Sequence, residues 1–226
     1  VNVLTWGLLY VFAGQGVRLD AIEDLRGKTL LVGAKNDAPD LLTRFVLKSA
    51  GLDPDRDVTL SYVGTSAEAV PLLLAGKADA AVLPEPAASA AEIKAKQAGI
   101  SIARALDVTE LYAARSGRPA GIPQAGLAVT KTFLDAHPDV VAALHAASVA
   151  AAGWVADSPK AAAALIADPL KLPIPIVEAS LPRFRLKVAS ASEAKVDLEA
   201  YFSALMTLSP DIVAGHLPDA AFYWGP

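Results

Sequence analysis

One complete strand–helix–strand unit occupies residues 74–103, with the sequence LAGKADAAVLPEPAASAAEIKAKQAGISIA. The apolar run Ala78–Leu83 predicts a buried strand, since nearly every residue in it is apolar rather than every second one. The alanine-rich stretch Ala87–Ala98 predicts a helix that ends at Gly99, because glycine readily takes the left-handed conformation of a helix stop. Ile100–Ala103 predicts the next strand. A helix between two strands usually joins them within a parallel sheet.

The same order of strand and helix precedes this unit. Thr29–Val32 and Val58–Val63 are short apolar runs that predict two further buried strands. The helix between them is predicted to begin at Pro39, because proline is favoured at the first position of a helix. A capping box formed by Thr65 and Glu68 predicts the start of the next helix. Together the strands predict a largely parallel sheet covered by helices.

The order of elements changes at both ends of this region. Val1–Phe12 predicts one buried strand before it, and Pro123–Val129 predicts a strand after it. Between them Asp107–Ile122, which is rich in glycine, proline and polar residues, predicts a loop. The rest of the chain is predicted to be almost entirely helical, with helices at residues 138–156, from 159, at 175–181 and at 190–208.

These elements predict an α/β protein with two lobes. Residues 22–122 are expected to form the second lobe, and residues 1–21 and 123–226 the first lobe and the hinge. Two segments cross between the lobes, because the chain leaves one body, builds the other and returns. Clefts between such lobes are common binding sites for small molecules.

Composition excludes several kinds of site. The 226-residue chain has a net charge of −4 and no run of Lys or Arg, which argues against a nucleic-acid partner. It has no cysteine, and therefore no disulfide, thiolate metal site or cysteine nucleophile. Its three histidines, His137, His145 and His216, lack the spacing of a zinc-binding pair. Because the sequence also has no nucleotide-binding loop or nucleophile elbow, we expect no catalytic residue, metal or cofactor.

The mean hydropathy of +0.40 is high enough to suggest a membrane span. The longest uncharged stretch lies between Asp139 and Asp157 and is mostly alanine. It is shorter than the roughly 20 strongly apolar residues that a span needs, so we expect a buried helix there. The first residues have neither the basic segment nor the cleavage site of a signal peptide.

Short motifs with the order and spacing of one protein class extend over nearly the whole chain. They are DLRGKT at 24–29, AGLDP at 50–54 with DVT at 57–59, AGKADAA at 75–81, PEP at 84–86, and LPD at 217–219 with FY at 222–223. In these motifs the chain resembles the ABC-transporter substrate-binding proteins of the nitrate/sulfonate/taurine class, which have the type II periplasmic-binding-protein fold. Members of that class begin with a strand–helix–strand region that has no counterpart here, so the resemblance implies an incomplete first lobe.

The resemblance also implies a function. It implies a protein that lies in the periplasm, or is lipid-anchored at the cell surface, and that captures a small organic molecule in the cleft between its lobes. Closure of the lobes on the ligand then creates the shape that the permease of an ABC importer recognises. A monomer without enzyme activity is implied as well.

Ligands of open parallel sheets bind beyond the carboxyl ends of the strands. This rule selects three loops of the second lobe, and the predicted ligand-binding residues in them are Asn36, Asp37, Thr65, Ser66 and Glu85. Glu85 is the most informative of these, because it stands between two prolines and has no capping partner in the sequence. For Asp37 and Thr65, helix capping is an equal alternative.

Three further candidates come from the hinge. Trp6 and Tyr10 are four residues apart on one predicted strand, so both side chains are expected to face the same side, where a ligand ring could stack on them. Gln124 stands at the start of the return strand. Ordinary core packing is the alternative for all three residues.

Negative charge near these loops bears on the ligand. Asp37, Asp40 and Glu85 disfavour a fully anionic molecule, so we expect a neutral or amine-bearing ligand with Glu85 as an acceptor. Two other functions stay open. One is a lyase-type enzyme on the same fold, for which Lys35 is the nearby candidate, and the other is the effector-sensing domain of a transcription regulator.

Overall fold

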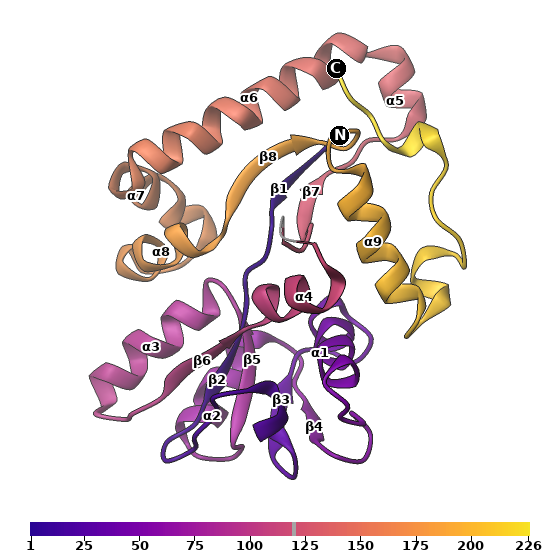
Figure 1. Ribbon diagram of the computed structural model, residues 1–226. Coiled ribbons are helices and arrows are strands. Elements are labelled where there is room, and N and C mark those ends of the chain that lie inside the picture. Colours follow the sequence, from indigo (N-terminus) through magenta and orange to yellow (C-terminus); the bar gives the residue numbers. More distant parts are fainter. Residues whose placement is uncertain (119–120) are drawn as a thin grey trace. The chain divides into compact units, whose positions relative to one another are not determined.

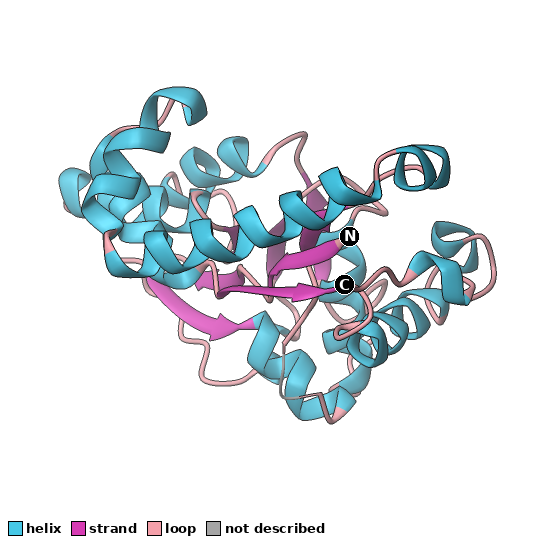
Figure 2. Cartoon of the chain, turned by 90° about the horizontal axis from the view of Figure 1, so that it is seen from above, coloured by secondary structure: helices cyan, strands magenta, loops and turns pink. Residues whose placement is uncertain are grey.

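The computed structural model describes residues 1–118 and 121–226, which form two compact units (Figure 1). Unit 1 comprises Val1–Gly7 and Ala120–Pro226, and unit 2 comprises Leu8–Pro119. Both combine helices with short strands (Figure 2). The division differs from the predicted boundary at residue 22, because residues 9–13 form a strand within the sheet of unit 2.

Unit 2 contains a five-stranded sheet in the order β4-β3-β5-β2-β6. Its strands β3 (Thr29–Val32), β4 (Thr59–Tyr62) and β5 (Ala80–Pro84) run parallel to one another, as the alternation of strands and helices predicts. Strand β2 (Leu9–Ala13) lies between β5 and β6 (Ala103–Asp107) and is antiparallel to both. The sheet is therefore mixed, because one strand comes from outside the repeating pattern.

Four helices cover the sheet of unit 2. Helix α1 (Ala38–Ser49) packs with α4 (Val108–Ser116), and α2 (Ser66–Leu74) packs with α3 (Ala87–Ala98). The two pairs lie on opposite sides of the sheet (Figure 1). All five residues of β2 are buried, as expected for a central strand that helices cover on both faces.

Helix α4 lies where the sequence predicts a loop. The Asp107 carboxylate caps it by accepting hydrogen bonds from the N–H groups of Thr109 (2.8 Å) and Glu110 (3.2 Å). Gly117, with a φ of 68°, ends it. The predicted loop is wrong for residues 108–116, because this cap and stop outweigh the weak helical pattern between them. Residues 119 and 120 of the same predicted loop lie outside the described residues.

Replacing Asp107 with alanine is expected to lower the free energy of unfolding by about 1 kcal/mol, the usual cost of a lost helix cap. Two N–H groups at the start of α4 then lose their acceptor. Urea denaturation followed by circular dichroism measures the loss. Asp107→Asn is the control, because asparagine caps helices about as well as aspartate. Equal stability of Asp107→Ala and the parent chain would contradict the capping role.

Unit 1 contains a three-stranded antiparallel sheet in the order β7-β1-β8. The strands are β1 (Asn2–Thr5), β7 (Ala125–Leu127) and β8 (Leu186–Ser190). Its helices are α5 (Lys131–Ala136), α6 (Pro138–Asp157), α7 (Pro159–Leu170), α8 (Ile174–Ser180) and α9 (Lys195–Met206). Strand β8 is not predicted from the sequence, and the last helix begins at Lys195 rather than at the predicted Ser190. The Ser190 N–H does donate to the Glu193 carboxylate at 2.8 Å, but this bond closes a turn ahead of α9.

The first twelve residues form two strands rather than one. Strand β1 ends at Thr5 and pairs with strands of unit 1, whereas β2 begins at Leu9 and pairs with strands of unit 2. Between them Gly7 has a φ of 122°, a conformation that glycine adopts without steric cost. The prediction that Trp6 and Tyr10 share one side of a strand is therefore wrong, because the two-residue alternation of a strand ends at this break.

Helix α6 is unusually exposed for an apolar helix. Among the described residues it is the one helix whose length and composition would allow it to cross a membrane. A single such helix is weak evidence for a membrane span. Of its 20 residues only Val141 is buried. Val140, Leu144 and Trp154 are 47%, 40% and 42% exposed. The prediction of a buried helix is therefore wrong for α6 as it lies in unit 1.

Candidate functional site

Three loops of unit 2 leave the carboxyl ends of neighbouring parallel strands. They join β3 to α1, β4 to α2 and β5 to α3, and the three strands are adjacent in the order β4-β3-β5. Parallel strands end at the same edge of a sheet, so these loops gather there. We call residues 33–37, 63–66 and 85–86 the carboxyl edge. It contains five of the predicted ligand-binding residues: Asn36, Asp37, Thr65, Ser66 and Glu85.

The first loop of the carboxyl edge is tightly shaped. Asn36 has a φ of 67°, a left-handed conformation that asparagine tolerates better than most residues. Asp37 caps α1, because its Oδ1 accepts the N–H of Asp40 at 3.0 Å. A Cβ atom at Gly33 would lie 2.9 Å from Asp37 Oδ2, so a side chain at Gly33 would displace the cap. Ligand contact by Asn36 and Asp37 stays a prediction beside the capping role.

A buried carboxylate supports this loop from behind. The side chain of Asp40 is 0% exposed, and its Oδ2 accepts the backbone N–H of Asn36 at 2.8 Å. Its Oδ1 accepts Arg44 Nε and the Tyr62 hydroxyl, both at 3.1 Å. Arg44 also donates to the Tyr62 hydroxyl oxygen at 2.8 Å. Because buried charge is stable only when it is paired and hydrogen-bonded, Asp40, Arg44 and Tyr62 form one mutually dependent network.

Both partners of Asp40 keep one protonation state near neutral pH. Burial raises the pKa of the Tyr62 hydroxyl, and the charge of Asp40 raises it further against the opposing effect of Arg44. Burial lowers the pKa of Arg44, but its hydrogen bonds to Tyr62 and Asp55 and the charge of Asp40 outweigh burial and raise it above the ordinary value. Arg44 is therefore a cation, and Tyr62 a neutral hydroxyl.

The second loop presents hydrogen-bond donors. Thr65 is the N-terminal cap residue of α2, but its hydroxyl makes no capping bond. The predicted capping box is not formed, because Glu68 accepts the N–H of Gly64 instead, at 3.0 Å. Within the described part of the chain, the Ser66 hydroxyl has no hydrogen-bond partner either. These two hydroxyls stand at the start of a nine-residue helix, where first-turn N–H groups also lack acceptors within the helix.

Glu85, in the third loop, is buried and contacts two groups of the protein. Its side chain is 0% exposed, its Oε1 lies 2.8 Å from Arg104 Nη1, and its Oε2 accepts the N–H of Ser89 at 3.1 Å. The sequence shows no capping partner for Glu85, but its Oε2 accepts an N–H group in the first turn of α3, and Arg104 pairs with its Oε1. The sequence does not indicate Arg104 as a partner, because Arg104 comes from β6. It does not indicate Ser89 either, because Ser89 lies one residue beyond the capping-box position. Contact between Glu85 and a ligand stays a prediction.

Arg104 contacts four side chains, two carboxylates and two aromatic rings. Besides Glu85 it binds Glu92, with two hydrogen bonds of 3.1 Å. Its guanidinium lies 4.1 Å from the ring centroid of Tyr10 and 5.0 Å from that of Phe12. Burial lowers the pKa of Arg104, but Glu92 and Glu85 outweigh burial and raise it above the ordinary value. Tyr10 is buried in the core between the sheet and helices α2 and α3, so packing accounts for its position.

The remaining two candidates, Trp6 and Gln124, belong to unit 1. Trp6 is buried, packs against Val3 and Ala189, and donates from Nε1 to the carbonyl oxygen of Lys187 at 2.6 Å. Core packing therefore accounts for Trp6 as well. The backbone N–H of Gln124 donates to the carbonyl oxygen of Thr5 at 3.0 Å.

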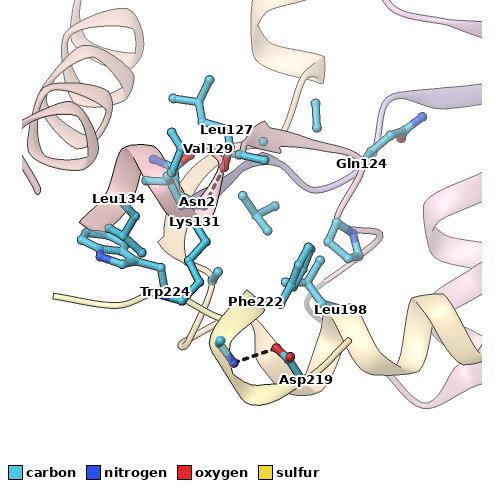
Figure 3. A pocket seen from close by; sticks show the side chains of 18 residues that line it. Asn2, Gln124, Leu127, Val129, Lys131, Leu134, Leu198, Asp219, Phe222 and Trp224 are labelled. Atoms are coloured by element: carbon cyan, nitrogen blue, oxygen red, sulfur yellow. Dashed lines mark hydrogen bonds between the residues drawn. The ribbon is translucent and has the colours of Figure 1, made fainter. Parts of the chain in front are cut away.

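Gln124 also lines a cavity of about 500 Å³ within unit 1. Most of the lining is apolar, and Leu134 and Trp224 lie at the opposite end from Gln124, whose side chain turns away from them (Figure 3). The charged side chain of Lys131 is paired with Asp135 at 2.6 Å. Few polar groups converge on this cavity, so we favour the carboxyl edge of unit 2 as the candidate site.

The sequence predicts the loops of the carboxyl edge but not the residues that support them. Only the negative charge of Asp40 is evident from the sequence, and the parts of Arg44, Tyr62 and Arg104 are not. The spacing of four between Asp40 and Arg44 is a readable signal for an ion pair on a helix, whereas Tyr62 and Arg104 come from separate strands. Within residues 1–118 and 121–226, no cluster of three or more His, Cys, Asp or Glu side chains is placed to hold a metal ion.

Similarity to known proteins covers nearly the whole chain. The NMT1-like family matches residues 19–170. Among curated protein sequences, none matches the chain significantly. Among solved structures, the chain is similar to an ABC transporter protein from Parabacteroides distasonis, with 25% identity and a TM-score of 0.80. That match covers 99% of this chain and 72% of the other.

Two further solved structures share the fold at lower identity. The periplasmic aliphatic sulphonate binding protein SsuA from Escherichia coli is 19% identical, with a TM-score of 0.76 and coverage of 99% of this chain and 71% of that one. The desulfurization enzyme DSZB is 16% identical, with a TM-score of 0.55 and coverage of 91% and 71%. The predicted α/β fold of periplasmic binding proteins is confirmed by these similarities.

Proposed function

We propose that this chain, which belongs to the NMT1-like family, is the solute-binding component of an ABC importer. Its similarity to the ABC transporter protein from Parabacteroides distasonis and to SsuA from Escherichia coli supports the proposal. We further propose that the protein works outside the cytoplasmic membrane, where it binds a small organic molecule and delivers it to a permease. A binding protein of this kind binds and releases the solute without changing it chemically.

The carboxyl edge of unit 2 is the proposed binding site. The observation that carries this assignment is the contrast between its donors and its acceptors. The hydroxyls of Thr65 and Ser66 are unpartnered among the described residues, while the nearby carboxylates of Asp40 and Glu85 are each paired with an arginine. Two free hydroxyls, which can donate hydrogen bonds, beside carboxylates that are already ion-paired suit a ligand that accepts hydrogen bonds.

This contrast changes the expected chemistry of the ligand. The preference for a neutral or amine-bearing molecule assumed that Asp37, Asp40 and Glu85 leave net negative charge at the edge. Arg44 pairs with Asp40 but also with Asp55, and Arg104 pairs with Glu85 but also with Glu92, so the arginines reduce the negative charge without cancelling it. Asp37 accepts a hydrogen bond as a helix cap. Helix N-termini favour negative charge. We therefore propose a small organic ligand whose head group is a sulfonate, a carboxylate or a carbonyl.

Native mass spectrometry of the gently purified protein tests the function directly, because a bound solute adds its own mass. Isothermal titration with ethanesulfonate, 2-aminoethanesulfonate and propionamide then compares head groups of similar size. We expect a bound small molecule and measurable affinity for at least one of the three. A protein that carries no solute and binds none of the probes would contradict the proposal.

Removing the donors of α2 is expected to weaken binding. Thr65→Val and Ser66→Ala should each lower the affinity for the tightest of the three probes by about 3- to 10-fold, since a hydrogen bond contributes roughly 0.5–1.5 kcal/mol. Titration calorimetry measures the change. Ser203→Ala in unit 1 removes an exposed hydroxyl far from this edge in the sequence and serves as the matched control. Unchanged affinity in both α2 variants would show that the ligand binds at another place in the protein.

An enzyme on the same fold is the second candidate, because the fold is shared with the desulfurization enzyme DSZB. The two candidates differ in what happens to the ligand. Incubation of the bound solute with the protein, followed by mass spectrometry, should recover it unchanged if the protein is a binding protein. Formation of a product that requires the protein would favour the enzyme.

A further inference from the structure

The backbone at Asn36 is held in a conformation that few residues adopt unaided. Its φ of 67° is left-handed, and only three other non-glycine residues of the described chain have a positive φ. Asparagine tolerates this region better than most residues but does not favour it over extended or helical conformations. Some further interaction must therefore select it, and the bond from the Asn36 N–H to Asp40 Oδ2, at 2.8 Å, is in the right place to do so.

The Asp40 carboxylate is itself held from the opposite side. Arg44 and Tyr62 both donate to Oδ1, which leaves Oδ2 directed at Asn36. Arg44 is one turn further along α1, and Tyr62 is the last residue of β4. The same network therefore connects the loop after β3 to the strand that leads into the next loop of the carboxyl edge.

We propose that Asp40 is a positioning residue, which holds Asn36 in its left-handed conformation and so sets the shape of the proposed ligand-binding loop in advance. A loop that already has its bound shape loses less conformational entropy when a ligand binds. The effect on ligand binding rests on the proposed function. The hydrogen bond by which Asp40 fixes the conformation of Asn36 does not depend on that function, and it is tested first.

Amide hydrogen exchange, followed by NMR on the whole chain, measures the hold on the loop. In Asp40→Asn the amide oxygen should stay toward the positive charge of Arg44, which turns the NH2 group toward the Asn36 N–H. Two donors then face each other and the bond is lost. We expect the Asn36 amide to exchange about tenfold faster or more, since the lost bond is made to a charged group. Unchanged exchange at Asn36 would overturn the proposal.

Asp57→Asn is the matched control. Asp57 Oδ2 accepts the backbone N–H of Asp53, four residues earlier, at 2.9 Å, which repeats the relation between Asp40 and Asn36. The control makes the same chemical change at a similar turn and should leave exchange at Asn36 unchanged. Faster exchange at Asn36 in the control would mean that the whole unit has loosened, and this too would count against a specific hold.

Tyr62→Phe keeps the test decisive if Asp40→Asn does not fold. It removes one bond to the carboxylate and leaves its charge and the bond to Asn36 in place. We expect faster exchange at Asn36 by about threefold, corresponding to the lower range of a single hydrogen bond. No change in this variant would overturn the role of the network.

The link to binding is tested by comparing two backgrounds. Asp40→Asn should lower the affinity for 2-aminoethanesulfonate more in the parent chain than in the Asn36→Gly variant, because glycine adopts a positive φ without support. Equal losses in both backgrounds would mean that Asp40 affects binding only through general stability. If the parent chain binds no probe, the proposed function fails, while the exchange experiment still decides whether Asp40 holds the loop.

Discussion

Replacing Arg104 with methionine is expected to lower the free energy of unfolding by about 3–5 kcal/mol, the cost of leaving one member of a buried ion pair without its partner. Glu85 then remains 0% exposed without the guanidinium 2.8 Å from its Oε1. Glu92 loses two hydrogen bonds, and the Tyr10 ring loses the cation that lies over it. Guanidinium chloride denaturation, followed by circular dichroism, measures the loss.

Arg115→Met is the matched control for this prediction. Arg115 pairs with Glu23 at 3.5 Å, and Glu23 is half exposed, so the loss should stay below about 1 kcal/mol. The double variant Glu85→Leu with Arg104→Met should recover much of the stability, because it removes both charges of the pair. Equal stability of Arg104→Met and Arg115→Met would show that Glu85 is not a buried anion.

Replacing Gly126 with alanine is expected to cost about 3 kcal/mol, at the upper end of the usual cost of overpacking. Gly126 lies in β7, opposite Val3 of β1. An added Cβ atom would clash with the carbonyl oxygen of Asn2 and lie 3.2 Å from the Cα of Val3. Both contacts are to backbone, which cannot rotate away as a side chain does, so the two strands must separate. Thermal and urea denaturation, followed by circular dichroism, measure the effect.

Gly153→Ala is the control, because it makes the same chemical change where nothing lies within 4 Å of the added Cβ atom. Gly153 is inside α6, where alanine is the better helix former, so this variant should be more stable by about 0.5–1 kcal/mol. Opposite signs for the two glycine substitutions are expected. A stable Gly126→Ala would mean that β7 and β1 do not approach as closely as described.

The sequence predicts those elements of unit 2 whose signals are local. Helix α3 has the predicted bounds, because prolines precede it and Gly99, with a φ of 68°, ends it. Strand β3 also has the predicted bounds. The position of β2 in the sheet was not predictable in this way, because the paired residues of β5 and β6 lie 67–97 residues later in the chain. A short stretch of sequence does not show which distant segment a strand pairs with.

The site shows the same division between local and distant signals. The rule for parallel sheets identifies the loops that hold Asn36, Thr65 and Glu85 from sequence alone. It does not reveal which side chains are already occupied. Glu85 looked unpartnered because Arg104 is 19 residues away in the sequence, on another strand. Burial and pairing decide the charge of a site, and both depend on contacts that only the folded chain makes.

The chemistry of the Asp40 network has a consequence for the conditions under which the protein can work. Tyr62 and Arg44 both have pKa values raised above their ordinary values, which are already alkaline. A shift of the medium from neutral to moderately alkaline therefore changes the charge of neither group. We expect the loop at Asn36 to keep its form throughout that range, because the two donors to Asp40 Oδ1 do not change.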